Sequence, residues 1–500
     1  MDDETTCSRV KRSIMDTVRI VPYGTLDISL ETDNQDYLKG VYNFFEYYVK
    51  NYRFMPQYTK GGWNGKRSVF KKSTRSLPYG LLTDVVKYTM LKWKNEISVE
   101  IDSDVKVMYK GINHNINWNL LYTPHYYQEE IITAALLNAK GIFKAPTASG
   151  KSLIASYIVR ELLERGETNQ AIIIVPTIGL VGQFKGDMID YYIDESSIGM
   201  VDKDHKEWKK SIVVSTWQSL KNNTSELRRY NAVLVDEVHG VRGDVLHDIL
   251  QQSNAFWRLG FTGTMPQDPL EALQVKSYLG PLLKSYKSSK LADEGYIATC
   301  NVVKINVSYN REFKGDYSDV KNEVFSSPFR LNIISSIVRG VNGSILLLVD
   351  KIEKEGDILE QHIKENFPDK QVVFLHGSVD SETRMFWQKK CHDEKNVVLI
   401  ATFGIFQLGI NIKSLMYGVL CSSFKSSIRV LQSIGRTLRK HPTKEGGGAY
   451  IFDINDMVKF LDKHGHEREK FYGIEEFNVI DVNISEGDNC VNIRQLVELP

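Results

Sequence analysis

Short apolar runs alternate with longer segments of helical spacing over two stretches of the chain, from about residue 118 to 295 and from about residue 300 to 456. Near-continuous apolar runs are typical of strands in a parallel sheet that helices cover on both faces. The expected strands are 171–175, 212–215, 232–235 and 258–261 in the first stretch and 344–349, 371–375, 397–400, 417–420 and 448–452 in the second. The pattern predicts an α/β protein with two parallel-sheet domains in tandem. No sequence repeat relates the two stretches, although they could be structural duplicates.

The start and the end of the chain follow other patterns. Residues 18–22 and 26–30 alternate weakly, and residues 38–52 have helical spacing, which together predict a small α+β domain. A chain of 500 residues is too long for one compact core. We therefore expect a small N-terminal domain at 1–112, α/β domains at 113–298 and 299–456, and a helical extension at 457–500 that opens with a charged run.

Basic residues gather in one segment of an otherwise near-neutral chain. Between residues 50 and 94 there are eleven lysines and arginines and one acid, Asp84, a local charge of +10 in a chain whose net charge is +1. Aromatic residues are interleaved with them, and we interpret these as core of the small domain. A lysine excess without acids is not needed for solubility, so it predicts phosphate contact, with a merely solvated surface as the alternative.

Composition argues against a membrane or secreted protein. No apolar run reaches the length of a membrane span, and the first seven residues are acidic and polar, unlike a secretory signal. The five cysteines are scattered without metal-ligand spacing. We expect reduced thiols and a cytoplasmic protein, in a host cytoplasm if the chain is viral.

Residues 145–152, with the sequence Ala-Pro-Thr-Ala-Ser-Gly-Lys-Ser, join a short apolar run to an apolar helical segment. A small-residue loop between a strand and a helix directs backbone N–H groups and the positive helix end at a phosphate. Lys151 would reach the β and γ phosphates of a nucleotide, and the Ser152 hydroxyl would hold Mg²⁺. Ala145 departs from the usual glycine at the first position, and the alternative is an ordinary strand–turn–helix.

An acidic pair, Asp236 and Glu237, follows the expected strand at 232–235. Doubly wound sheets place ligand chemistry at the carboxyl ends of their strands. Asp236 would hold Mg²⁺ through water, and Glu237 would orient and deprotonate an attacking water. The alternative is a solvated strand end, which the preceding phosphate loop makes less favourable.

Two arginines, Arg436 and Arg439, stand three residues apart, so they share one face of a helix. A guanidinium offers a planar fork that suits a γ-phosphate in its transition state. Such a pair could instead be a surface ion-pair face. Its position after a phosphate loop and an acidic pair favours the catalytic interpretation.

Taken in order, these motifs resemble those of superfamily 2 helicases over roughly residues 120–455. The resemblance implies two RecA-like domains that bind ATP and Mg²⁺ between them. It implies catalytic roles for Lys151, Glu237, Arg436 and Arg439. It implies nucleotide contacts from Tyr127, Gln128, Ala145, Thr147, Ser149, Gly150, Lys151, Ser152, Asp236 and Gln432, with Ser152 and Asp236 on the metal. It also implies nucleic-acid contacts near Thr177, Thr216, Gly377 and Thr402, while Asn411 stands where an aspartate is frequent.

A narrower resemblance covers the N-terminal domain. The segments 53–58, 62–66 and 77–80, together with 216–218 and 434–441, are similar to UvsW-type phage helicases. That family regresses forks, migrates Holliday junctions and unwinds R-loops in recombination, repair and replication. The resemblance implies branched, forked and single-stranded DNA as partners, with Lys66, Arg67, Lys71 and Lys72 on duplex phosphates and replication or recombination proteins as further partners. The alternatives are a DExH RNA helicase, the motor subunit of a restriction-type translocase and a junction-binding protein without ATPase activity.

We expect Arg439→Ala to lower kcat for ATP hydrolysis far more than it weakens ATP binding. An arginine supplied across a domain cleft stabilises charge that develops only in the transition state, and such residues contribute ~10³-fold or more. Measuring kcat and ATP affinity on the same purified variant checks this expectation. A loss confined to affinity would refute the assignment.

Overall fold

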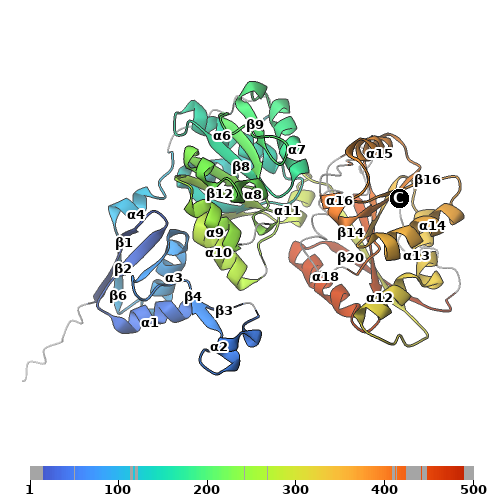
Figure 1. Ribbon diagram of the computed structural model, residues 1–500, viewed down its shortest axis with the longest axis horizontal. Helices are drawn as coiled ribbons and strands as arrows, with labels where there is room; N and C mark the ends of the chain where they lie inside the picture. The colour runs from blue at the N-terminus through green and yellow to red at the C-terminus, as the bar shows by residue number, and fades with distance from the viewer. Residues whose placement is uncertain are drawn as a thin grey trace, which may run out of the picture.

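A computed structural model of the chain arranges its elements in three groups that follow one another along the long axis (Figure 1). The structure describes residues 15–49, 51–112, 116, 118, 122–240, 243–266, 268–407, 412, 414–423, 441 and 448–488. Within these residues, no helix combines the length and the apolar character needed to cross a bilayer.

The N-terminal group is built on a mixed four-stranded sheet of order β5-β2-β1-β6. Its strands are β1 (Asp16–Tyr23), β2 (Asp27–Glu31), β5 (Ser76–Pro78) and β6 (Ile97–Ile101). The helices are α1 (Gln35–Phe44), α3 (Leu82–Lys92) and α4 (Ser103–Val107). Strand β1 runs antiparallel to β2 and parallel to β6, and alternate residues such as Val18 and Ile20 are fully buried. The expected α+β character is confirmed.

A second, two-stranded ribbon projects from this sheet. It consists of β3 (Glu46–Tyr48) and β4 (Lys66–Ser68), and its loop carries α2 (Pro56–Thr59) and a 3-10 turn at Tyr52–Phe54. The helix expected over 38–52 is wrong beyond Phe44, because residues 46–48 pair with 68–66 instead. The expectation that the aromatics are core holds for Phe70 and Tyr79 but fails for Phe54, which is 84% exposed.

The first α/β group has a seven-stranded, all-parallel sheet of order β13-β7-β12-β11-β8-β10-β9. The strands are β7 (Lys140–Lys144), β8 (Ala171–Val175), β9 (Ile198–Val201), β10 (Ile212–Thr216), β11 (Ala232–Val235), β12 (Trp257–Thr262) and β13 (Leu282–Ser285). Its helices are α5 (Tyr126–Asn138), α6 (Lys151–Glu164), α7 (Ile178–Asp190), α8 (Trp217–Lys221), α9 (Gly243–Gln251), α10 (Pro269–Leu279) and α11 (Ser288–Asp293). The central strands are buried throughout, and for this reason their apolar runs could be recognised in the sequence.

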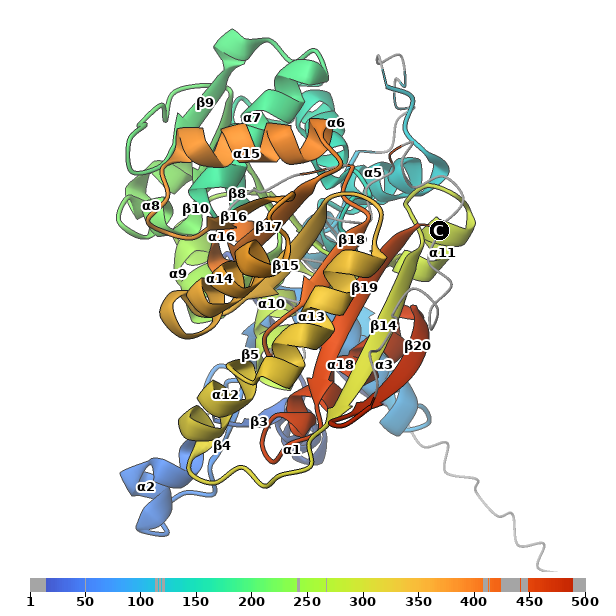
Figure 2. The ribbon, with the colours of Figure 1, turned by 90° about the vertical axis from the view of Figure 1, so that its right-hand side faces the viewer.

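The second α/β group repeats this architecture with a sheet of order β16-β17-β15-β18-β19-β14-β20 (Figure 2). The strands are β14 (Cys300–Ser308), β15 (Ile345–Val349), β16 (Gln371–Leu375), β17 (Val397–Thr402), β18 (Tyr417–Leu420), β19 (Ala449–Asp456) and β20 (Asn478–Ser485). The helices are α12 (Tyr317–Phe325), α13 (Pro328–Gly340), α14 (Asp357–Asn366), α15 (Ser381–Asp393), α16 (Phe403–Gln407) and α18 (Asp462–Glu475). When the strands of each sheet are counted in chain order, corresponding strands occupy corresponding positions in the two sheets. The two groups are therefore structural duplicates with the RecA-like arrangement.

The C-terminal segment differs from the expected helical extension. It contains helix α18, but it also supplies strand β20, which pairs along its whole length with β14. Because β20 lies at the sheet edge, several of its side chains remain exposed, and its polar residues hid it in the sequence. The segment is therefore part of the second sheet.

The N-terminal group is held against the first α/β group through helix α10. Asp84 pairs with Lys276 at 3.3 Å, and the Tyr79 hydroxyl donates to the Tyr278 carbonyl. Lys140 is enclosed at the same junction over the rings of Tyr79 and Phe256. Burial, with a smaller contribution from the nearby Arg258, lowers the pKa of Lys140 to about 7.

Gly80 lies where these two groups touch. A Cβ atom at this position would stand 1.9 Å from the Lys276 carbonyl oxygen and 2.8 Å from that of Ser277. Both are backbone atoms of helix α10, so a side chain here forces the two groups apart.

We expect Gly80→Ala to destabilise the chain by roughly 1–3 kcal/mol, the usual cost of overpacking. Urea unfolding monitored by intrinsic fluorescence measures this cost. Gly62→Ala is the control, since its Cβ would meet only the Gln57 carbonyl oxygen at 3.7 Å. Equal stability of the two variants would show that the contact is not close-packed.

Candidate nucleotide site

The loop between β7 and α6 has the conformation of a phosphate cradle. Ala148 and Gly150 both take positive φ, 70° and 79°, and helix α6 begins directly at Lys151. The Ala145 N–H donates to the Thr262 carbonyl at 2.9 Å, which fixes the loop to the end of β12. The first-turn N–H groups of α6 have no helical acceptors and face the loop opening, as an anion site requires.

Tyr127 and Gln128 lie beneath this loop. The Tyr127 hydroxyl and the Gln128 amide donate to the Ser149 carbonyl at 2.9 and 2.8 Å. A Cβ at Gly150 would stand 2.4 Å from the Gln128 amide nitrogen, so glycine is needed both for its positive φ and for this close approach. The two residues are thus brought to the predicted site, where they brace the loop. The predicted Thr147 lies on the loop itself and faces Gly263. A Cβ atom added at Gly263 would lie 3.7 Å from the Thr147 backbone nitrogen.

Lys151 and Glu237 form a buried ion pair. The Lys151 ammonium is 3.0 Å from a Glu237 carboxylate oxygen, and the two side chains are only 10% and 12% exposed. Burial acts to raise the pKa of Glu237, but the charges of Lys151 and then His239 outweigh it and hold this pKa below its usual value. Glu237 also has a φ of 47°, an uncommon conformation that aims its carboxylate at the loop.

Asp236 fits a cation site. Its carboxylate is buried, and the Oδ1 atom has no hydrogen-bond partner among the described residues. Burial, reinforced by the charge of Glu237, raises the pKa of Asp236, so a bound cation would stabilise the carboxylate. Mg²⁺ is commonly held by one or two protein oxygens together with substrate phosphates, and Asp236 with the Ser152 hydroxyl suits that requirement.

His239 links the acidic pair to the neighbouring strand, a role that the sequence did not assign. Its Nδ1 lies 2.7 Å from the Thr262 hydroxyl and 3.4 Å from Glu237. The Thr262 hydroxyl donates to the Thr264 carbonyl at 2.6 Å, so Nδ1 is the donor toward Thr262. In the sequence, the one indication of such a role was that His239 and Thr262 each belong to a recognised motif, at 236–239 and at 262–264.

The predicted nucleic-acid residues of the core lie at carboxyl ends of adjacent strands. Thr177 follows β8 and precedes α7, and Thr216 ends β10, the strand beside β8. Gly377 follows β16, and Thr402 ends β17, the strand beside β16. The structure thus brings each pair together within its own sheet.

The predicted basic residues surround the projecting ribbon. Lys66 pairs with Glu46 and Lys71 with Asp27, at 3.4 and 2.7 Å. The guanidinium of Arg67 lies over the Trp63 ring and the ammonium of Lys72 over the Tyr42 ring. The predicted Gln432, Arg436 and Arg439 fall outside the residues that the structure describes.

Comparison with known proteins matches three families along the chain. Residues 13–102 match "DNA helicase UvsW, N-terminal", 121–267 match "Type III restriction enzyme, res subunit", and 330–441 match "Helicase conserved C-terminal domain". The ATP-dependent DNA helicase uvsW of Enterobacteria phage T4 is 27% identical over 480 residues, covering 88% of this chain and 94% of that protein. Along most of its length, the chain is therefore similar to UvsW-type superfamily 2 helicases.

More distant similarities extend over the core. The DNA 3'-5' translocase XPB2 of Sulfurisphaera tokodaii is 25% identical over 352 residues, covering 63% of this chain and 78% of that protein. A fragment structure of a putative HsdR subunit of a type I restriction enzyme from Vibrio vulnificus YJ016 aligns with a TM-score of 0.56 at 15% identity, over 74% of this chain and 70% of that one. The second similarity concerns the fold alone. The matched helicase models and the similarity to an ATP-dependent DNA helicase show that the protein is an ATP-hydrolysing helicase.

We expect Glu237→Gln to retain ATP binding but to hydrolyse ATP about 10²–10⁴-fold more slowly, the range of a general base. The amide keeps the shape of the side chain and loses its basicity. Steady-state ATPase assays and equilibrium binding of a fluorescent ATP analogue measure the two effects. Glu226→Gln, which disturbs an exposed pair with Arg229, is the control. Equal losses of binding and turnover would make Glu237 a structural residue.

Proposed function

We propose that this protein is an ATP-driven DNA helicase or translocase that remodels branched DNA in recombination, repair and replication, acting in the cytoplasm. The observation that carries the proposal is the basic, aromatic N-terminal ribbon joined directly to a helicase core. Its substrates would be forks, four-way junctions and R-loops. The similarity of residues 13–102 to the N-terminal family of UvsW supports this reading.

ATP hydrolysis would take place between the two α/β domains, whose boundaries we set at 113–298 and 299–456, with β20 completing the second. Lys151 would hold the β and γ phosphates, and Glu237 would orient the attacking water and accept its proton. Bound Mg²⁺, held by Ser152 and Asp236, would neutralise charge on the phosphates. Arg436 and Arg439 would reach the γ-phosphate from the second domain, so that closure of the domains gates the reaction.

The core would grip one DNA strand along the carboxyl edges of both sheets. Thr177 and Thr216 lie at helix N-termini, where backbone N–H groups bind phosphates without reading sequence. The Thr177 hydroxyl is buried without a partner among the described residues, which leaves it available to a phosphate. Gly377 and Thr402 would supply the corresponding contacts from the second sheet.

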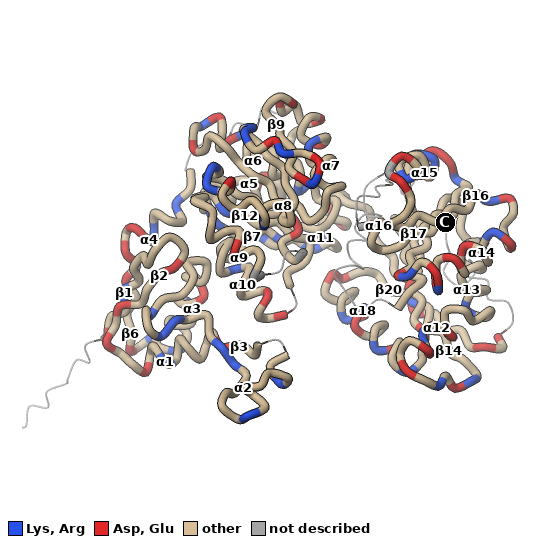
Figure 3. Tube along the Cα trace, viewed as in Figure 1, with Lys and Arg blue, Asp and Glu red and all other residues tan. Residues whose placement is uncertain are grey.

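The projecting ribbon, residues 46–68, would hold duplex near the branch point. Figure 3 shows lysines and arginines along this ribbon and the adjoining helix α3. Tyr48 and Tyr52 stack with their ring centroids 4.9 Å apart, Tyr48 is 55% exposed, and Phe54 is largely exposed. Exposed rings beside cations suit nucleic acid, since phosphates pair with the charges and unpaired bases stack on the rings.

We expect alanine at Lys66, Arg67, Lys71 and Lys72 together to weaken fork and junction binding. Each lost phosphate contact lowers the slope of log affinity against log salt by roughly 0.9, so the slope should flatten by up to about 3–4 units. Basal ATPase should remain. ATPase stimulated by single strands should fall less than unwinding of branched DNA. Binding titrations at several salt concentrations, with ATPase and unwinding assays on single strand, duplex, fork, four-way junction, R-loop and structured RNA, measure these effects.

The matched control carries alanine at four exposed lysines of the second α/β group and its helix α18, Lys354, Lys364, Lys463 and Lys470. It removes the same charge far from the ribbon and should leave the slope unchanged. Unaltered junction affinity and slope in the ribbon variant, with folding matched by circular dichroism, would remove the anchoring role. Stronger stimulation by structured RNA would favour the RNA helicase alternative. Translocation on duplex without strand separation would favour the restriction-type motor.

A further inference from the structure

The corner between helix α18 and strand β20 connects the second α/β domain to the first. Glu475, the last residue of α18, is only 2% exposed, although its carboxylate reaches out of its own domain. It lies 3.0 Å from the Lys144 ammonium and accepts a hydrogen bond from the Ser288 hydroxyl at 2.9 Å. A carboxylate this deeply buried is stable only where its partners are fixed.

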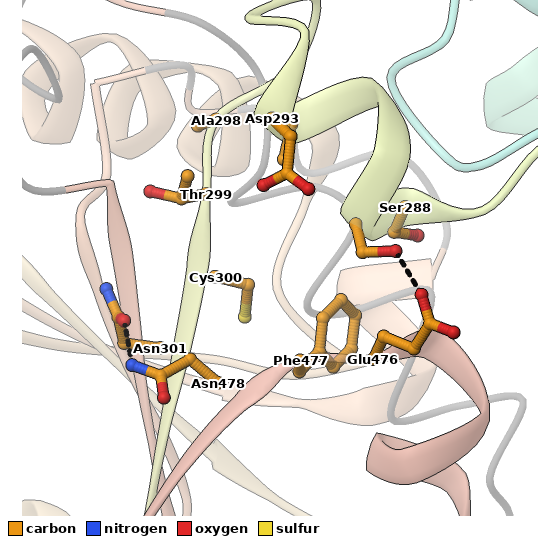
Figure 4. A pocket seen from close by; sticks show the side chains of 11 residues that line it. Ser288, Asp293, Ala298, Thr299, Cys300, Asn301, Glu476, Phe477 and Asn478 are labelled. Carbon is orange, nitrogen blue, oxygen red and sulfur yellow. Dashed lines mark hydrogen bonds between the residues drawn. The ribbon is translucent and has the colours of Figure 1, made fainter.

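The next residue continues the same connection. Glu476 takes a φ of 56°, which turns the chain and directs its carboxylate to the start of helix α11. There it pairs with Lys287 and accepts from the Ser289 hydroxyl at 2.9 Å (Figure 4). Two consecutive carboxylates of one domain are thus held by four polar side chains of the other.

The positions of these partners connect the corner to the nucleotide site. Lys144 ends strand β7 and directly precedes the phosphate loop. Residues 287–289 open helix α11, which follows β13, the strand that pairs with β7. The corner is therefore attached to β7, which leads into the phosphate loop, and to the helix that follows its neighbour β13.

The corner also lies beside the covalent crossover between the domains. The Asn478 amide, at the start of β20, donates at 2.8 Å to Asn301 at the start of β14, the first strand after the crossover. A cavity of about 390 Å³ separates α11 from this edge of the second sheet and is lined by Asp293, Thr299 and Phe477 among others (Figure 4). Atoms next to a hinge move least when domains rotate, and the cavity leaves room for that rotation.

We propose that the Glu475–Glu476 corner is the pivot on which the second domain closes over ATP, and that Lys144 and Glu475 are positioning residues for hydrolysis. The proposal rests on the ATP-driven closure described above. A pivot anchored at the base of the phosphate loop fixes the path by which groups of the second domain approach the γ-phosphate. Without this pivot the domains would still close, but the groups of the second domain would be less accurately positioned at the γ-phosphate.

Lys144→Met, Glu475→Gln and the double variant test this pivot in the full chain. Because displacements of about 1 Å cost up to roughly 100-fold in rate, we expect kcat for DNA-stimulated ATPase to fall about 10- to 100-fold. The KM for ATP should change little, since the phosphate loop itself is intact. Each variant should also consume more ATP per base pair unwound. The double variant should be no worse than the poorer single one, because both changes break one link.

Glu130→Gln is the matched control. Glu130 pairs with Lys284 at 2.7 Å and with the Tyr286 hydroxyl, entirely within the first domain and at a similar sheet edge. This variant should keep its kcat and its coupling ratio. If the losses in the pivot variants were no larger than in this control, or if they multiplied in the double variant, the pivot would be excluded.

Variants at the exposed positions of the corner test the pivot even if the buried variants fail to fold. Lys287 and Glu476 are each about half exposed, 50% and 53%, so charge reversal there is tolerable. Glu476→Lys should raise ATP consumption per base pair unwound, and adding Lys287→Glu should restore it. Failure of this rescue contradicts the pivot. A wild-type protein that hydrolyses ATP without remodelling any branched substrate would instead contradict the proposed function.

Discussion

The candidate nucleotide site depends on the buried ion pair between Lys151 and Glu237. Each charge alone would be expensive in this site, because burial removes its hydration, and each is stable only beside the other. The pair joins the phosphate loop after β7 to the acidic motif after β11, across the intervening strand β12. His239 and Thr262 extend the same network to the end of β12. The three strand ends that carry these motifs are thereby held in one arrangement.

Duplication of the sheet gives the two α/β domains equivalent edges at the carboxyl ends of their strands. Both sheets have the same strand order, so both place their loops at a carboxyl edge. In the first sheet β7 and β11 lead into the candidate nucleotide motifs, while β8 and β10 lead into the candidate nucleic-acid threonines. Nucleotide and nucleic acid would therefore be sensed on one rigid framework. Movement of the second domain relative to this framework can then couple the two.

The N-terminal domain adds a different kind of contact. It is fixed to α10 by backbone proximity at Gly80 and by a buried lysine at their junction, so its ribbon is carried as part of the first α/β domain. On the ribbon itself, Tyr48 and Phe54 are exposed, and so are Arg53, Lys60 and Arg67. A ribbon with exposed side chains, fixed rigidly to the first α/β domain, would suit the proposed role of holding one duplex arm while the helicase core moves another.

The sequence alone determined what depends on neighbouring residues. The strands 171–175 and 232–235 were predicted to the residue, since a continuous apolar run has one stable place, inside a covered parallel sheet. The phosphate loop could be recognised because its function requires small residues, a lysine and a serine in a fixed order within one short segment. Strands β13 and β20 escaped prediction, because these edge strands keep polar residues and lose the apolar signal. The short strand β9 and the internal strand β14 were not predicted either. Only the tertiary structure decided that Lys144 meets Glu475, 331 residues away, and that His239 meets Thr262. Such contacts depend on how sheets and helices are packed, and no local pattern of residues encodes that distance.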